Sequence, residues 1–106
     1  MDLAENVIRL TMTFPKTQQY GLTSQLQRCM WSVPSNIAEG HGRGTRRDYC
    51  HYVSIAKGSL VEAAAQLELA TRVGFVAEDV SKPLLAEMYE IERMLSSLRS
   101  RLMEPK

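Results

Sequence analysis

The last part of the chain repeats apolar residues at alternating spacings of four and three, without a break. The repeat consists of Leu84, Met88, Ile91, Leu95, Leu98 and Leu102. A helix with ~3.6 residues per turn places all of these side chains on one face, which is typical of the seam of a helix bundle. Because that face must be buried against other helices, the repeat requires the rest of the chain to supply them.

Two apolar patterns near the start of the chain predict the first two helices. Residues 3–14 carry apolar side chains at helical spacing, and Pro15 is expected to end that helix. A second helix is predicted over residues 23–40. Ser24 and Gln27 fit a capping box at its start, in which the serine accepts a backbone amide and the glutamine reaches back.

The third and fourth helices are predicted over residues 46–73 and 80–103. Thr45 and Asp48 form a start signal for the third helix, because the threonine can cap its first turn and the carboxylate favours its positive end. Gly74 is a natural terminator of the same helix. Each of the four segments is therefore bounded by residues that start or stop helices.

The sequence shows no alternating β-branched run that would predict a strand. With 106 residues, the chain has room for one domain and a single modest core. We therefore predict one all-α domain over residues 1–106, folded as an antiparallel up-down-up-down four-helix bundle.

Composition and cysteine usage set the expected compartment and cofactors. Apolar residues make up 44% of the chain, yet no stretch approaches the ~20 apolar residues of a membrane span. The N-terminal segment does not resemble a secretory signal, so we expect a cytoplasmic protein without a membrane partner. Cys29 and Cys50 fit no metal-ligand spacing. We therefore expect reduced thiols, no bound metal and no other cofactor.

The charge is unevenly distributed along the chain. The net charge is only +1, but residues 28–57 hold five basic and two acidic residues. This segment is centred on the stretch GHGRGTRR at Gly40–Arg47. Its glycines match neither a P-loop nor a dinucleotide-binding fingerprint, and no strand precedes them. We interpret the glycines first as the hinge between two helices.

The arginines of this stretch are the candidate binding residues. Arg43, Arg46 and Arg47 are expected to lie beside the positive end of the third helix, where a phosphate would meet both side chains and backbone amides. Weaker candidates for the same contact are His41, Lys57 and Arg28. The alternative is a solvated turn in which the arginines pair with Asp48 or Glu39.

Four polar residues interrupt the apolar pattern at equal spacings: Asn36 and Glu39, then Ser59 and Glu62. Because unpaired burial of polar groups is unfavourable, we expect each to find a partner. Our hypothesis is that Asn36 and Glu39 tie the end of the second helix to the following loop. A catalytic carboxylate pair is the alternative, but it lacks a nucleophile or a metal motif, so we predict no enzymatic activity.

Several large side chains fall outside the main apolar stripes. Tyr49, Tyr52 and Trp31 could stack on bases at the basic end, although at helical spacing they are more typical of core or subunit contacts. The apolar residues off the stripes are Met30, Trp31, Val53, Ile55, Val61, Leu69 and Leu85. A bundle of this size cannot bury every face internally, so this excess predicts a homo-oligomer.

The segment Leu22–Val76 contains the words NIAEG and GR, followed downstream by IAKGS. Together with FP at Phe14–Pro15 and EIERML at Glu90–Leu95, it resembles the four-helix-bundle proteins encoded in intervening sequences of bacterial 23S ribosomal RNA genes. The accessory variability protein of diversity-generating retroelements shares this superfamily. The family usually carries one to two further helical turns before the position of Leu3, so either the first helix is short or the start codon is misassigned.

The resemblance implies a barrel-like homopentamer without assigned catalysis. Relatives from retroelements bind nucleic acid and a reverse transcriptase, whereas the intervening-sequence members have no settled molecular function. The sequence therefore predicts a non-enzymatic oligomer that binds RNA or DNA through a basic end of the bundle. The alternative is a protein-interaction or scaffold subunit, for example a reverse-transcriptase accessory, with no nucleic-acid affinity of its own.

Overall fold

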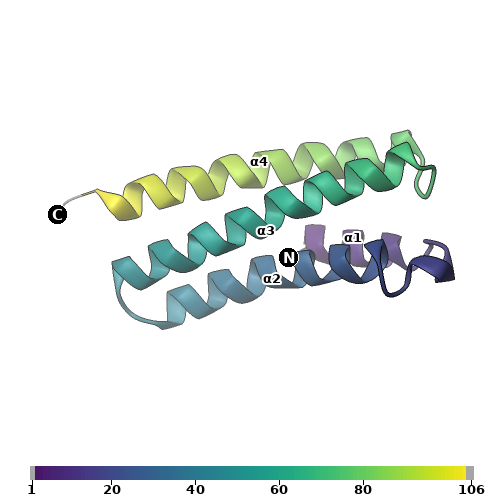
Figure 1. Cartoon of the computed structure of the whole chain (residues 1–106). Coiled ribbons are helices and arrows are strands. Elements are labelled where there is room, and N and C mark those ends of the chain that lie inside the picture. Colours follow the sequence, from purple (N-terminus) through teal and green to yellow (C-terminus); the bar gives the residue numbers. More distant parts are fainter. Residues whose placement is uncertain (1, 105–106) are drawn as a thin grey trace.

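The computed structural model describes residues 2–104 and contains helices but no strands over that range. The elements are α1 (Asp2–Thr11), the short 3-10 helix η1 (Lys16–Gln18), α2 (Leu22–Gly42), α3 (Arg46–Arg72) and α4 (Glu78–Met103). Consecutive long helices run antiparallel, and the molecule is elongated, with extents of 49 × 23 × 18 Å (Figure 1). The predicted all-α four-helix bundle is confirmed.

Helix α1 covers only part of the bundle. It has 10 residues, or about 15 Å, whereas α3 has 27 residues, or about 40 Å. It lies beside the half of α2 that is farther from the α2–α3 loop (Figure 1). The half of the bundle next to that loop is therefore built from three helices.

The end of α1 differs from the prediction of a helix over residues 3–14. The helix stops at Thr11, and the chain turns through hydrogen bonds such as that from the Phe14 amide to the Thr11 carbonyl, 3.1 Å. Pro15 moves only Phe14 out of the helical region, and the three residues before Phe14 already follow tighter three-residue turns. Phe14 still reaches the core, where its ring lies 5.9 Å from that of Phe75.

The predicted capping box of α2 is wrong. The helix begins at Leu22 after Gly21, which makes no side-chain cap. Gln27 instead donates its side-chain amide to the hydroxyl of Thr11 at 2.8 Å. Thr11 is only 1% exposed, so the contact pairs a buried polar residue between α1 and α2. Because α1 lies beside α2, Gln27 forms a hydrogen bond with Thr11 instead of capping its own helix.

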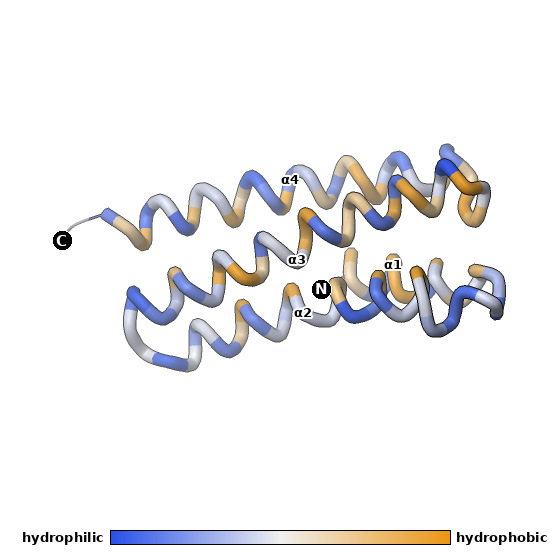
Figure 2. The backbone as a smooth tube through the Cα atoms, viewed as in Figure 1, coloured by the Kyte–Doolittle hydropathy of each residue, from blue (hydrophilic) through white to orange (hydrophobic). Residues whose placement is uncertain are grey.

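Apolar side chains from all four helices form one continuous core. Figure 2 shows hydrophobic positions concentrated where α3, α4 and the turn between them meet. Met30 and Val53, which the sequence placed off the main stripes, are both fully buried, so that prediction is wrong for them. Their helices each pack against two neighbours, α2 against α1 and α3, and α3 against α2 and α4. More than one apolar stripe of each helix is therefore covered. Trp31, Ile55, Val61 and Leu69 are exposed, as expected.

Candidate nucleic-acid interface

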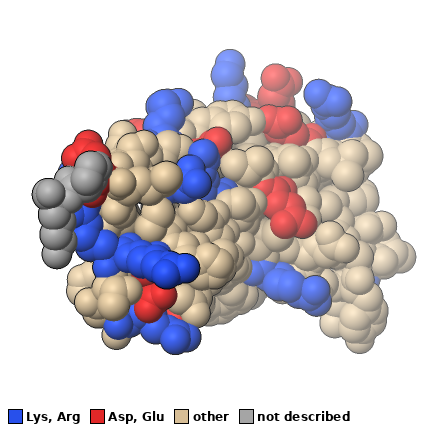
Figure 3. Space-filling view, turned by 60° about the vertical axis from the view of Figure 1, so that its left-hand side comes forward, with Lys and Arg blue, Asp and Glu red and all other residues tan. Residues whose placement is uncertain are grey.

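The α2–α3 loop and the end of α4 meet at one end of the molecule, which we call the loop end and define as residues 39–48 and 99–104. Arg43–Thr45 join the two helices, and Gly44 adopts a φ of +84°, a left-handed conformation that favours glycine. The loop end holds five arginines and three carboxylates. Figure 3 turns this end forward and shows its basic side chains around scattered acidic ones.

Arg43 is held by two partners. Its guanidinium forms a 2.7 Å ion pair with Glu39, one turn back on α2, and donates to the Tyr52 hydroxyl at 2.9 Å. The same guanidinium lies 5.3 Å from the centre of the Tyr52 ring. The Glu39 hydrogen bond, followed by Tyr52, raises the pKa of Arg43 above its ordinary value. The predicted pairing of Arg43 with Glu39 is confirmed, and the guanidinium is fixed in place.

Arg46 and Arg47 serve different purposes although they are adjacent. Arg46 donates to the main-chain carbonyl of Arg101 at 2.6 Å, and this bond satisfies a carbonyl in the last turn of α4. Arg47 is exposed and makes no side-chain hydrogen bond or ion pair within residues 2–104. Of the three candidate arginines, Arg47 is the one with no structural task in the described chain.

Sequence reasoning missed Arg99 and Arg101 as members of this end. They lie in the last turns of α4, and Arg99 donates to the Ser54 hydroxyl on α3 at 2.8 Å. Both could have been predicted from the antiparallel order of the helices, because that order brings the end of α4 beside the α2–α3 loop. The α2–α3 loop and two helices, α3 and α4, therefore contribute arginines to the loop end.

Thr45 begins α3 as the sequence predicted. Its hydroxyl accepts a hydrogen bond from the Asp48 amide at 3.1 Å, and its backbone is extended. Replacing Thr45 by alanine should lower the free energy of unfolding by about 1 kcal/mol, because the first turn loses its side-chain cap. Urea unfolding followed by circular dichroism checks this, with Thr17→Ala as a control that removes an exposed hydroxyl without a hydrogen-bond partner in residues 2–104. Equal stability of the two variants would contradict the assigned cap.

The aromatic residues do not form a stacking platform at the loop end. Tyr49 and Tyr52 are half-buried beside Gly40, and the guanidinium of Arg43 lies over the Tyr52 ring. His41 is exposed and meets the Tyr49 ring edge-on at 5.6 Å. Trp31 is 63% exposed and lines a hollow of about 440 Å³ between α1 and α2, away from this end.

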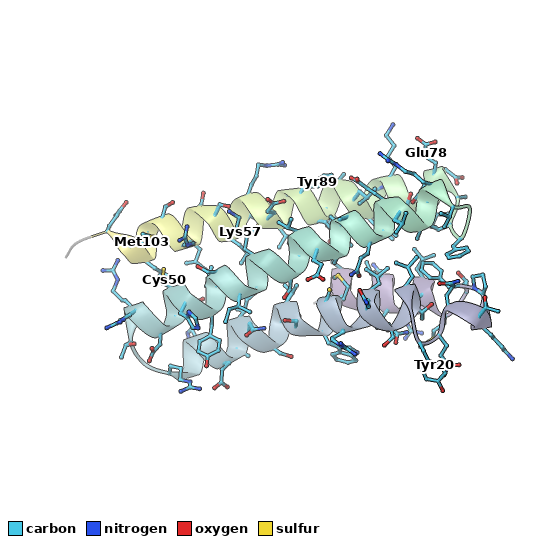
Figure 4. All side chains as sticks on the ribbon, viewed as in Figure 1. Tyr20, Cys50, Lys57, Glu78, Tyr89 and Met103 are labelled. Carbon is cyan, nitrogen blue, oxygen red and sulfur yellow. The ribbon has the colours of Figure 1, made fainter. Side chains whose placement is uncertain are left out.

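The two remaining candidates, Lys57 and Arg28, lie outside the loop end. Lys57 lines a groove between α3 and α4, where Figure 4 shows it between the two ribbons. Arg28 lies on α2 and lines a separate hollow between α2 and α3 with Glu62. The structure therefore brings His41, Arg43, Arg46 and Arg47 together and leaves Lys57 and Arg28 apart.

The polar motif of α2 and α3 ties these helices to each other. The Ser32 and Ser59 hydroxyls share a 2.8 Å hydrogen bond, and Asn36 donates to both the carbonyl and the hydroxyl of Ser32 at 2.8 Å. The expected link from Asn36 to the following loop is wrong, because its amide turns back by one helical turn. Glu39 does face forward, toward Arg43.

The hollow beside this network has a volume of about 330 Å³ and is lined by Cys29, Ser59 and Glu62 among others. Burial, with the Glu62 carboxylate as a further cause, raises the pKa of the Cys29 thiol above its ordinary value. The thiol therefore stays protonated near neutral pH, which disfavours it as a nucleophile. Within residues 2–104, no three His, Cys, Asp or Glu side chains gather as a metal-ligand set.

The chain matches a known protein family and resembles a solved structure. A family model described as 23S rRNA-intervening sequence protein matches residues 1–97. A crystal structure from Bacteroides thetaiotaomicron VPI-5482, described as a protein with unknown function from the S23 ribosomal protein family, superposes with a TM-score of 0.85. The two chains are 21% identical over 92% of each, a likeness that shows the fold alone. No curated protein matches the chain.

Over residues 2–104, no helix combines the length and the apolar character needed to cross a bilayer.

Proposed function

The chain belongs to the family of 23S rRNA-intervening sequence proteins, and we propose that it is a non-enzymatic oligomeric protein that binds RNA or DNA at its loop end. The observation that carries the proposal is the convergence of arginines from the α2–α3 loop, α3 and α4 on that end. They are Arg43, Arg46, Arg47, Arg99 and Arg101. Phosphate groups are the ligands that such a cluster recognises, because each guanidinium offers several donors to phosphate oxygens.

The arginines divide into anchored and free ones. Arg43 and Arg46 are already ordered by contacts within the chain, which lowers the entropy lost when they meet a phosphate. Arg47 is exposed at the first turn of α3, where the helix dipole adds positive potential. Contacts of this kind read the phosphate backbone rather than the base sequence.

One copy of the loop end offers few phosphate contacts, so the proposal includes self-association. By resemblance the assembly is a homopentamer, which would multiply the contacts through avidity. The exposed apolar residues Trp31, Ile55 and Leu69 support an interface between copies. Light scattering should give about 60 kDa, five times the 12.0 kDa of one chain. A monomer at working concentration would contradict this part of the proposal.

Titration of a labelled RNA hairpin and a DNA duplex tests the nucleic-acid proposal. The dissociation constant is measured at about 50 mM and 200 mM salt, and binding should weaken steeply as counterions compete for the phosphates. The logarithm of the affinity should fall by about 0.9 per contact for each tenfold rise in salt on duplex DNA. Absence of binding to both probes at low salt would refute the function.

The second candidate is a protein-interaction or scaffold subunit, such as an accessory of a reverse transcriptase. It is favoured by the hollow between α1 and α2, where Met12 and Trp31 are 73% and 63% exposed. Association through such an apolar surface depends weakly on salt. A stable assembly without affinity for either nucleic-acid probe would favour this candidate.

A further inference from the structure

Gly58 lies in the interior of α3, where glycine lowers helix stability relative to alanine. A Cβ atom added there would meet no atom within 4 Å, and the backbone has no left-handed angle. Neither packing within the chain nor backbone conformation therefore requires a glycine at this position. Gly40 is the contrast, because an added Cβ there would approach Tyr52 Cβ to 2.6 Å.

The surroundings of Gly58 are cationic. A groove of about 350 Å³ between α3 and α4 is lined by Ser54, Lys57, Gly58, Val61 and Arg99. The Arg99 guanidinium is oriented by its 2.8 Å hydrogen bond to the Ser54 hydroxyl. Within residues 2–104, neither Lys57 nor Arg99 lies within ion-pair distance of a carboxylate.

We propose that this groove, Ser54–Val61 of α3 with Arg99 of α4, is a second contact for the sugar–phosphate backbone of a nucleic acid. Lys57 and Arg99 donate to phosphate oxygens from neighbouring helices, and Val61 offers an apolar wall to the sugar. Gly58, without a side chain, lets the strand approach the helix backbone closely. The inference rests on the proposed function and extends it from the loop end to the side of the bundle.

The groove and the loop end lie on one continuous path. Arg46 and Lys57 are eleven residues apart on α3, or about 16 Å along its axis. Arg99 stands beside Ser54 between them, so cations follow the seam of α3 and α4 from the loop end onward. A strand bound at Arg46 therefore needs only a few nucleotides to reach Lys57.

A helix from a second copy is the competing occupant of the groove, since small residues also favour close helix packing. For that contact to be favourable, the second copy would have to place carboxylates beside both Lys57 and Arg99, since burying unpaired charges is strongly unfavourable. A phosphodiester backbone pairs both cations and keeps them in contact with solvent. The charges thus favour the nucleic acid.

Gly58→Ala separates the effects on folding and on binding. The variant should unfold at a higher temperature, by about 4–8 °C, because alanine favours the helix and meets no neighbour. Its affinity for the RNA hairpin at about 50 mM salt should fall about tenfold, comparable to the loss of one phosphate contact. Lys57→Gln, which leaves every arginine of the loop end in place, should also bind more weakly and show a smaller salt slope than wild type.

The controls distinguish failure of this inference from failure of the proposed function. Lys82→Gln removes one charge near the start of α4, at the other end of the bundle, and should bind as wild type does. If Gly58→Ala and Lys57→Gln bind normally while Arg47→Gln binds weakly, the groove is not a contact and the loop end stands. A change in light-scattering mass for Gly58→Ala would assign the groove to a subunit interface instead. If wild type binds neither probe, both proposals fail.

Discussion

Gly40→Ala is expected to lower the free energy of unfolding by about 1–3 kcal/mol, the usual range for forcing an extra group into a packed site. The added Cβ would come within 2.6 Å of Tyr52 Cβ and 3.2 Å of Tyr49 Cδ1. The clash is with the stem of Tyr52 rather than a flexible tip, so α2 and α3 must separate to relieve it. Urea unfolding followed by circular dichroism measures the change.

Gly42→Ala is the matched control for this prediction. Gly42 belongs to the same helix, two residues later, and an added Cβ meets nothing within 4 Å. The control should be as stable as wild type or more stable, because alanine is the better helix former. If both variants lost the same stability, the effect would come from the backbone and the close approach of α2 to α3 would not explain it.

Arg43→Gln/Arg47→Gln is expected to weaken binding of duplex DNA on the order of a hundredfold at about 50 mM salt. Each lost phosphate contact removes about 0.9 from the salt slope, and two contacts at this concentration correspond to that factor. Arg46 is left intact because its side chain bonds the Arg101 carbonyl and its loss would disturb α4. Fluorescence anisotropy at two salt concentrations measures both the affinity and the slope.

Lys16→Gln/Lys82→Gln serves as the control, since it removes the same charge from the opposite end of the molecule. Its affinity should stay within a few-fold of wild type, because charges beyond about 10 Å from the bound phosphates are screened. An equal loss in both double variants would mean that net charge alone, rather than the loop end, controls binding.

The elements of the fold could be predicted from local chemistry. The spacing of Leu84 to Leu102, the Thr45–Asp48 cap and the Glu39–Arg43 pair each involve residues within a few turns of one helix, and the structure confirms them. Contacts between helices were harder to predict. Gln27 fits a capping box by spacing, yet it bonds Thr11 because α1 lies beside it.

In the candidate site, too, local features could be predicted from the sequence and contacts between helices could not. The arginines of the α2–α3 loop could be found in the sequence because they are contiguous, whereas Arg99 and Arg101 join them only through the antiparallel return of α4. No sequence pattern distinguishes Gly40, which sits against Tyr52, from Gly58, which faces a groove. That difference depends on where neighbouring helices place their side chains.

The central claim is that nucleic acid is held at the loop end, and hydrogen–deuterium exchange with and without the RNA hairpin tests it most directly. The backbone amides of Arg43–Thr45 and of the first turn of α3 should exchange more slowly in the complex, along with peptides covering the groove beside Gly58. The turn at Val73–Ala77, at the opposite end, should be unchanged. Slower exchange at that turn alone, or no change anywhere at saturating RNA, would contradict the account.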